Sequence, residues 1–171
     1  MILNNYLFYV YMKGHSFMAD DYAEYERECK KIHLENAKLL DEFADWLAAK
    51  RLSEKTVGRH CQNLEFYLNH FLLYEDAQRA EDGVLGAGMF LGYWFIRKAM
   101  WASQASIKSN AASLKKFYTF MFEKGKVDQE DLDDLKMQIK EEMPEWLATL
   151  ARYDDPDIDD PAEVWGLKRM V

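Results

Sequence analysis

The sequence is poor in the residues that build covalent and metal-based frameworks. It holds two cysteines, Cys29 and Cys61, which lie in helical patterns and form no C-x-x-C pair. This indicates free thiols in a reducing cytoplasm rather than a disulfide framework. The four histidines are scattered, without the H-x-x-x-H or H-x-x-E spacing of a metal site. We therefore expect a cytoplasmic protein with no metal and no cofactor.

The motifs of nucleotide-dependent enzymes and of covalent catalysts are also missing. There is no G-x-x-x-x-G-K-[ST] or G-x-G-x-x-G phosphate loop, and Gly86, Gly88 and Gly92 lack the strand that precedes one. His60 and Cys61 are adjacent, so they point to different faces of a helix and do not make a Cys–His nucleophile pair. The sequence thus predicts no catalytic residues, and an enzyme of another type is the least favoured class.

No apolar run has the length and composition of a membrane span. Residues 1–12 are apolar and aromatic, but they are too short and lack the cationic start and cleavage site of a signal peptide. Residues 87–102 are interrupted by Arg97 and Lys98, so we interpret them as a buried helix. Residues 1–17 are either an artefact of start-site choice or a strand-like arm that packs on a partner. We expect no membrane partner.

The 171 residues do contain many apolar side chains, and these recur at helical spacing. The composition is 49% apolar and 15% aromatic, which is ample for the core of one domain. Ser103 or Ser106 is a ready N-cap for a helix that Gly125 stops. The apolar stripe of this helix consists of Ile107, Ala111, Leu114, Tyr118, Met121 and Phe122. No strand pattern remains between stripes of this kind, so the prediction is an all-α fold.

Further stripes and caps predict the other helices. The first starts within residues 20–31 and continues to about Lys50, the second starts at Ser53, and the third, apolar on most sides, covers residues 84–100. Asp128 caps a fifth helix, which Pro144 ends or restarts. An extended, solvated acidic tail follows at residues 154–163. The predicted organisation is an N-terminal arm at 1–19, a helical domain at 20–143, and a short helix with the acidic tail at 144–171.

The net charge of −8 hides an uneven distribution. Residues 47–126 hold 12 Lys and Arg against 7 Asp and Glu, whereas residues 127–171 hold 5 against 14. The cations of the second and fourth predicted helices look away from the apolar stripes; they are Lys55, Arg59, Lys108, Lys115 and Lys116. Such a face is either a solvated surface over a core helix or a surface that attracts phosphates.

Several short motifs follow one another in a fixed order between residues 34 and 141. L-S-E-K-T-V at residues 52–57 is followed by Asn63-Leu64 and by Tyr67. F-A-D-W-L precedes it at residues 43–47, and S-I-K at 106–108, S-L-K-K-F-Y-T-F at 113–120 and G-K-V at 125–127 come after it. In this order and spacing they resemble the core-binding domain of tyrosine recombinases, or phage integrases, which opens on S-x-x-T-x-x-x-Y-x-x-D-L-x-x-F.

The resemblance implies a SAM-like, orthogonal bundle of four to five helices that forms half of a clamp around duplex DNA. It places one group of residues near one stretch of DNA and a second group near another; the groups are Ser53, Lys55, Thr56 and Arg59, and Ser106, Lys108, Lys115 and Lys116. The catalytic Arg, His-x-x-Arg and Tyr of the family have no counterpart, since no histidine is followed by arginine three positions later. A non-catalytic DNA-binding domain of a site-specific recombination system is the function implied.

Three departures from the family pattern keep an alternative open. His60 stands where the family has an aromatic residue, Asn63 stands where it has Asp, and Glu65 is negative where it is often basic. Glu65 and the acidic ends favour a protein-interaction module of the same fold that has lost DNA binding, with a recombinase or another protein as its partner. The basic middle of the chain favours duplex DNA instead.

Overall fold

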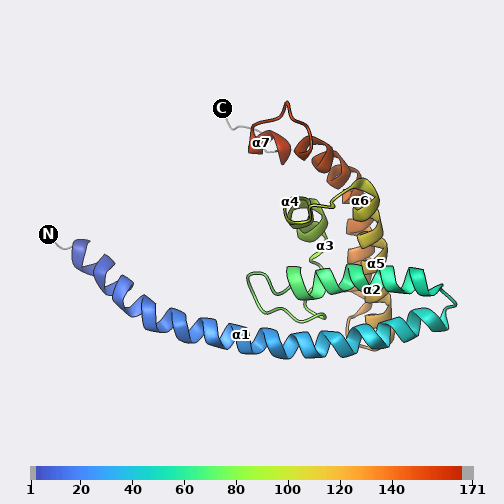
Figure 1. Ribbon diagram of the computed structural model, residues 1–171, viewed down its shortest axis with the longest axis horizontal. Helices are drawn as coiled ribbons and strands as arrows, with labels where there is room; N and C mark the ends of the chain where they lie inside the picture. The colour runs from blue at the N-terminus through green and yellow to red at the C-terminus, as the bar shows by residue number, and fades with distance from the viewer. Residues whose placement is uncertain (1–2, 167–171) are drawn as a thin grey trace.

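The computed structural model describes the backbone of residues 3–166 and the side chains of residues 22–166, and within that range every regular element is a helix (Figure 1). The predicted all-α fold is therefore confirmed. No helix in this described part is long and apolar enough to cross a bilayer.

The first helix, α1 (Leu3–Ala49), is much longer than predicted. It begins at Leu3 rather than near residue 20, and the interpretation of residues 3–17 as a strand-like arm is wrong because their backbone is helical. In Figure 1 this first part of α1 extends beyond the bundle. The helix ends where Arg51 adopts φ 62°, a left-handed conformation that stops the backbone ladder.

The second helix, α2 (Glu54–Phe66), starts as predicted, because the Ser53 hydroxyl accepts a hydrogen bond from the Thr56 N–H. Its last part widens into a π-helical segment, η1 (Tyr67–Phe71). The predicted third helix is shorter than expected and is built from α3 (Ala87–Met89), a π-helical segment η2 (Phe90–Trp94) and α4 (Phe95–Lys98). A Cβ on Gly92 would lie 2.7 Å from the Trp146 ring, so glycine at this position permits the close approach of a neighbouring helix.

The fourth predicted helix is α5 (Gln104–Glu123), which opens on a capping box between Ser103 and Ser106 and stops before Gly125 at φ 68°. Asp128 caps α6 (Gln129–Tyr153), as predicted. The predicted interruption at Pro144 is wrong, since α6 continues through it.

The predicted extended tail at residues 154–163 is also partly wrong. Residues 154–157 are exposed, but Asp160 caps a short helix, α7 (Pro161–Val164). Val164 is buried, and its carbonyl accepts a hydrogen bond of 2.8 Å from Arg152 Nε. The sequence also predicts a weak docking contact through the apolar Trp165 and Leu167, and Trp165 does pack against Tyr93 with 4.6 Å between the ring centroids. Its other predicted member, Leu167, lies outside the described residues.

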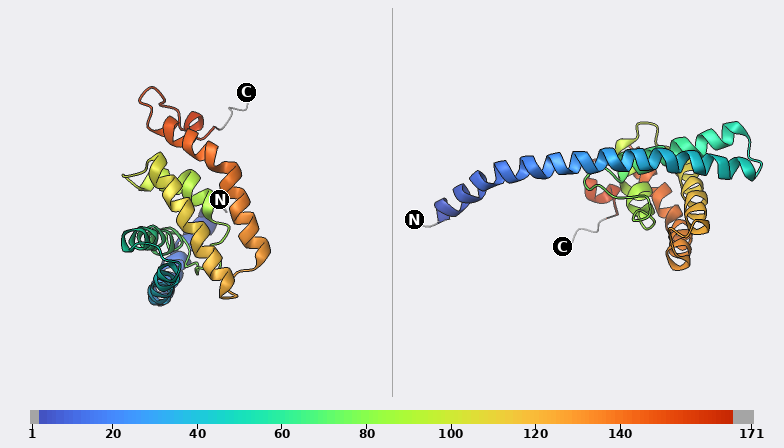
Figure 2. Two further views of the ribbon diagram at one scale, coloured as in Figure 1. Left: turned by 90° about the vertical axis from the view of Figure 1, so that its right-hand side faces the viewer. Right: turned by 90° about the horizontal axis from the view of Figure 1, so that it is seen from below.

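The helices form two crossed pairs. Figure 1 shows α1 and α2 running side by side, and Figure 2 shows them nearly end-on in the view where α5 and α6 lie in the plane of the picture. This crossing is the orthogonal arrangement that was predicted. The core lies where the pairs meet and contains fully buried side chains of four helices, among them Phe43, Leu47, Leu64, Tyr67, Phe117 and Leu135.

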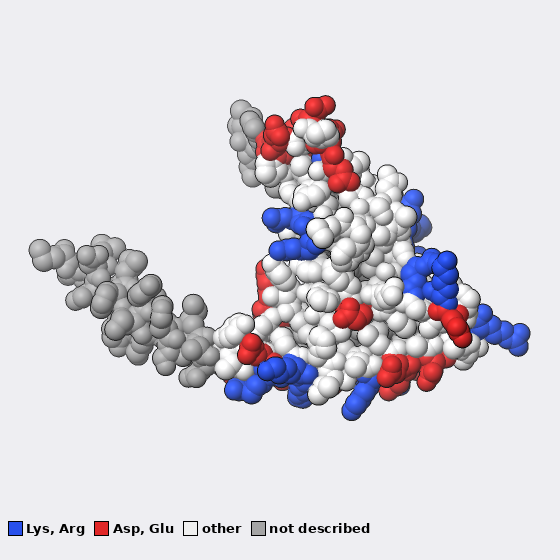
Figure 3. All heavy atoms as spheres, viewed as in Figure 1, with Lys and Arg blue, Asp and Glu red and all other residues white. Residues whose placement is uncertain are grey.

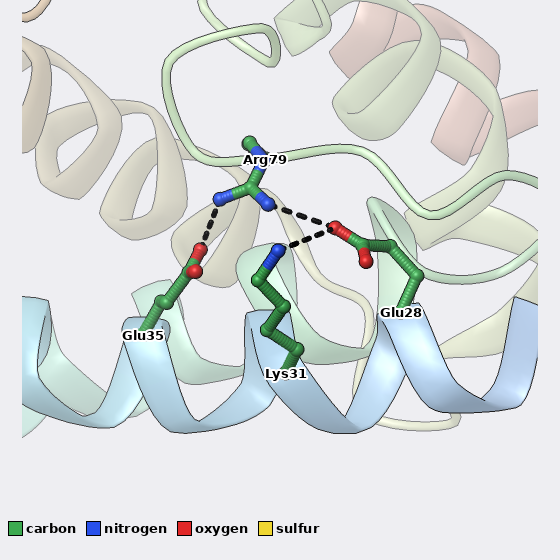
Figure 4. A network of polar contacts seen from close by, with 4 residues as sticks. All are labelled: Glu28, Lys31, Glu35 and Arg79. Atoms are coloured by element: carbon green, nitrogen blue, oxygen red, sulfur yellow. Dashed lines mark hydrogen bonds and ion pairs between the residues drawn. The ribbon is translucent and has the colours of Figure 1, made fainter.

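The second half of the loop between η1 and α3 is held to the bundle by side-chain contacts. Tyr118 Oη donates to the Ala80 carbonyl at 2.9 Å, and Tyr67 Oη donates to the Gly83 carbonyl. Arg79 forks between two carboxylates of α1, Glu28 at 2.8 Å and Glu35, and Lys31 joins Glu28 at 3.7 Å (Figure 4). The loop therefore has a fixed path over α1 and α5.

Candidate nucleic-acid interface

Helices α2 and α5 belong to different pairs of the bundle and pack against each other where they cross (Figures 1 and 2). His60 Nδ1 and Ser113 Oγ are 2.8 Å apart, and Asn63 Nδ2 donates to Ser109 Oγ at 3.0 Å and to Ser113 Oγ at 2.9 Å. Further along α2, the Phe66 ring lies 5.2 Å from that of Trp101, which precedes α5. Later residues of α2 thus meet earlier residues of α5.

This packing brings the two predicted groups of residues next to each other where Arg59 and Lys116 approach His60, and further cations of α2 and α5 extend the surface from that contact. We call it the basic face and define it by Lys55, Arg59, Lys108, Lys115 and Lys116. Burial lowers the pKa of His60 from its ordinary value, and the charges of Lys116 and Arg59 lower it further. Arg59 of α2 and Lys116 of α5 therefore lie close to one imidazole, although they are 57 positions apart along the chain.

The three hydroxyl-bearing residues predicted with these cations serve the helices themselves. The Ser53 hydroxyl caps α2 and contacts Thr56 Oγ1 at 2.9 Å, and Ser106 Oγ accepts from the Ser103 N–H at 2.8 Å. Ser53 lies at the start of α2, whereas Ser106 lies in the first turn of α5, which begins close to Phe66 at the end of α2. The structure does not bring those two residues together.

The cations of the basic face are unpaired. Within residues 22–166, whose side chains are described, none of the five takes part in an ion pair, whereas Arg79, Lys124 and Arg152 do. Lys55, Arg59, Lys108 and Lys115 are exposed and Lys116 is half-buried. Five charges in one region without counterions raise the local positive potential.

Glu65 does not neutralise this face. Its carboxylate lies 3.6 Å from His70 and 3.5 Å from Asn69 Nδ2, and the Asn69 side chain also accepts from Asn36 of α1. It therefore lies on the side of α2 that faces α1. In Figure 3 basic side chains gather at the right, where α2 begins and α5 passes in Figure 1, with a carboxylate group beside them. Both signs of charge alternate along the lower edge, and carboxylates predominate at the top.

Two features of this region were missed by reasoning from the sequence. His60 and Asn63 were recognised only as departures from a family pattern, whereas they join the helices through Ser109 and Ser113. The sequence did offer a signal for this contact. Each helix carries a pair of polar residues three or four positions apart, His60 with Asn63 and Ser109 with Ser113, so that both members of a pair lie on one side of their helix. The second feature is an exposed apolar pair, Met100 (98% exposed) and Trp101 (58%), at the end of the face near Phe66.

The described residues contain no group of three or more His, Cys, Asp or Glu side chains that could hold a metal ion. No family model, no curated protein and no solved structure matches the chain. The functional argument therefore rests on the geometry of the basic face.

Proposed function

We propose that this protein binds duplex DNA through the basic face and carries out no catalysis itself, as the core-binding half of a recombinase clamp would. The observation that supports this best is the set of five cations on two crossing helices, none of which forms an ion pair within the described side chains. Lysine and arginine side chains attract phosphates without reading base sequence, so this face would position the protein on the duplex.

The ion pairs elsewhere strengthen the argument. Several cations of the other surfaces are engaged with carboxylates, as Arg79 is with Glu28 and Glu35, and Lys50 is with Glu123 at 3.6 Å. A phosphate backbone that approached those surfaces would have to displace a carboxylate first. At the basic face no such displacement is needed.

The experiment changes Lys108, Lys115 and Lys116 to Glu and measures binding of a short duplex by fluorescence anisotropy. If all three contact phosphates, the slope of log K against log salt should be about −2.7, so affinity should fall roughly 40-fold between about 50 and 200 mM salt. The triple variant should lose binding while its helical circular dichroism stays unchanged.

A matched control carries the same change of charge on other surfaces. Lys30, Lys38 and Lys140 are exposed and form no ion pair within the described side chains. Their triple substitution by Glu should leave most of the affinity intact. Equal loss of DNA affinity in both variants would show that only the net charge of the protein matters, and it would overturn the assignment of the basic face.

The alternative function is a protein-interaction module, and one observation favours it. Met100 and Trp101 expose apolar surface at the end of the basic face, and tryptophan and methionine are enriched in protein interfaces. If the wild-type protein binds no duplex even at low salt, this alternative replaces DNA binding.

A further inference from the structure

A small aromatic cavity lies on a different part of the molecule, between η1 with its following loop and η2. Its volume is about 220 Å³. That volume is below the range of drug-sized ligand pockets and suits the head group of one side chain or a very small molecule. Four aromatic and two acidic residues are part of its lining; they are Phe71, Tyr74, Tyr93, Trp94, Glu75 and Asp76.

The rings meet at steep angles, so they form a corner rather than a stack. The Tyr74 and Trp94 centroids are 5.7 Å apart with 74° between the ring planes, and those of Phe71 and Trp94 are 5.5 Å apart at 67°. Tyr74 is 49% exposed and Tyr93 is 38% exposed, so the corner can be reached from solvent. Rings that face a shared space from different directions surround a ligand with the negative faces of their π systems.

The polar part of the lining has one sign of charge. Glu75 and Asp76 are exposed and take part in no ion pair among the described side chains, and no lysine or arginine is among the described residues that line the cavity. Aromatic faces and carboxylates both attract a cation and repel an anion.

The protein already places its own cations against the outer rings. Lys98 Nζ lies 4.7 Å from the Tyr74 ring centroid and donates to its hydroxyl at 2.7 Å, and the Arg97 guanidinium lies 5.2 Å from the Tyr93 centroid. Neither residue lines the cavity. These contacts show that the rings of Tyr74 and Tyr93 accept cationic groups as neighbours.

We propose that this cavity binds an N-methylated ammonium group, carried either by a methylated lysine of a partner protein or by a small molecule such as choline. Methyl groups spread the positive charge over an apolar surface that is weakly hydrated, which suits aromatic walls and a small volume. The carboxylates of Glu75 and Asp76 add an electrostatic attraction, so that a cationic ligand binds more tightly than a neutral ligand of the same shape. The site does not involve the basic face, so it stands or falls independently of DNA binding.

The first test compares choline with 3,3-dimethylbutan-1-ol, which has the same shape but a carbon atom in place of the charged nitrogen. Binding is followed by NMR of the tryptophan indole signals. Choline should bind at least tenfold more tightly than the alcohol. Equal affinities, or no binding of choline at about 10 mM, which is above the roughly 1 mM Kd of a weak specific ligand, would overturn the proposal.

Variants then test the residues. Glu75→Gln with Asp76→Asn should weaken choline binding at least fivefold, and Tyr74→Leu should weaken it similarly; all three positions are exposed, so the fold is retained. Asp134→Asn with Glu141→Gln changes the same charge at exposed positions of α6 and should leave affinity unchanged. Equal weakening by both acidic double variants would contradict a local role for Glu75 and Asp76.

A last comparison identifies the carrier. A short peptide with trimethyl-lysine and the same peptide with unmodified lysine are titrated beside choline. Tighter binding of the methylated peptide than of choline assigns the site to a protein partner, and tighter binding of choline assigns it to a small molecule. Preference for the unmodified peptide over the methylated one would overturn the role of the methyl groups.

Discussion

At the scale of single residues, two buried tyrosines join the loop between η1 and α3 to the core. Tyr67 and Tyr118 are both fully buried, and each donates a hydrogen bond to a carbonyl of that loop. Burial raises the pKa of both phenols well above the ordinary value, because the charged phenolate would lose its hydration. These two residues therefore link stability to pH.

The sign of that link predicts a loss of stability in alkali. In the unfolded chain both phenols ionise near pH 10, while in the folded protein they stay protonated, so the free energy of unfolding is unaffected below pH 10 and falls above it. Two such groups give a slope of up to about 2.7 kcal/mol per pH unit. Urea denaturation between pH 8 and pH 11 should show this fall. Tyr67→Phe with Tyr118→Phe should flatten it, and an unchanged slope in that double variant would contradict the explanation.

The orientation of α2 gives a second prediction at this scale. Leu64 is completely buried, whereas Arg59 is exposed and unpaired among the described side chains. Leu64→Ala should cost about 2–5 kcal/mol, because it removes packed atoms and leaves a cavity. Arg59→Ala should cost less than about 0.5 kcal/mol. Thermal melts of both variants check this, and comparable losses would mean that Arg59 is structural.

At the scale of elements, the two left-handed residues at helix ends differ in how well they fit their positions. Arg51 follows α1 with φ 62°, and Gly125 follows α5 with φ 68°. The left-handed conformation costs a residue with a Cβ roughly 1–2 kcal/mol and costs glycine much less. A Cβ at Gly125 would meet no atom within 4 Å, so only the backbone conformation matters there.

Opposite substitutions at these two positions should therefore have opposite effects. Arg51→Gly should raise the free energy of unfolding by up to about 1 kcal/mol, and Gly125→Ala should lower it by about 1 kcal/mol. Chemical denaturation of both variants measures the difference. Stabilisation by Gly125→Ala would show that the backbone at this position relaxes.

Helix α6 shows why Pro144 is a poor predictor of a helix end in this chain. Proline removes one backbone hydrogen bond and crowds the carbonyl four residues earlier, which costs about 3 kcal/mol in a free helix. Here Ile139 precedes it and Trp146 and Leu150 follow it, and all three are buried. Burial of apolar side chains on both sides offsets that cost, since each contributes roughly 1.5–3 kcal/mol.

At the scale of the whole molecule, the acidic C-terminal segment and the basic face belong to opposite regions. The segment from Asp154 to Glu163 follows α6, and Figure 1 shows α7 at the top of the molecule, away from the start of α2. Removal of residues 154–171 deletes six carboxylates and two basic residues. It also deletes the buried Val164 and the contact between Trp165 and Tyr93.

Two effects should follow from that deletion. If the basic face binds DNA, affinity should rise at low salt because a repulsive charge is gone, and the gain should disappear near physiological salt, where the screening length is about 8 Å. The melting temperature should fall because Val164 no longer packs. Anisotropy titrations and thermal melts measure the two effects.

A substitution variant separates charge from packing. Asp154, Asp155, Asp157 and Asp159 changed together to Asn remove four charges and keep α7 in place. This variant should show the gain in DNA affinity without the loss of melting temperature. Weaker DNA binding in either variant would contradict an inhibitory role of the acidic segment.

The sequence alone determined the helices and the inward and outward sides of most of them. Caps such as Ser53, Ser103 and Asp128 and the stop at Gly125 act within one turn of chain, so their residue types reveal them. The outward direction of Lys55 and Lys108 also follows from periodicity within one helix.

Only the tertiary structure decided what those helices meet. The crossing of α2 and α5 at the basic face, the roles of His60 and Asn63, the passage of α6 through Pro144 and the cavity beside Trp94 all depend on side chains distant in sequence. Packing between such residues is set by the shape of the assembled core, which local spacing does not encode. For this reason the candidate residues of the basic face could be predicted one helix at a time, whereas their union and the aromatic cavity could not.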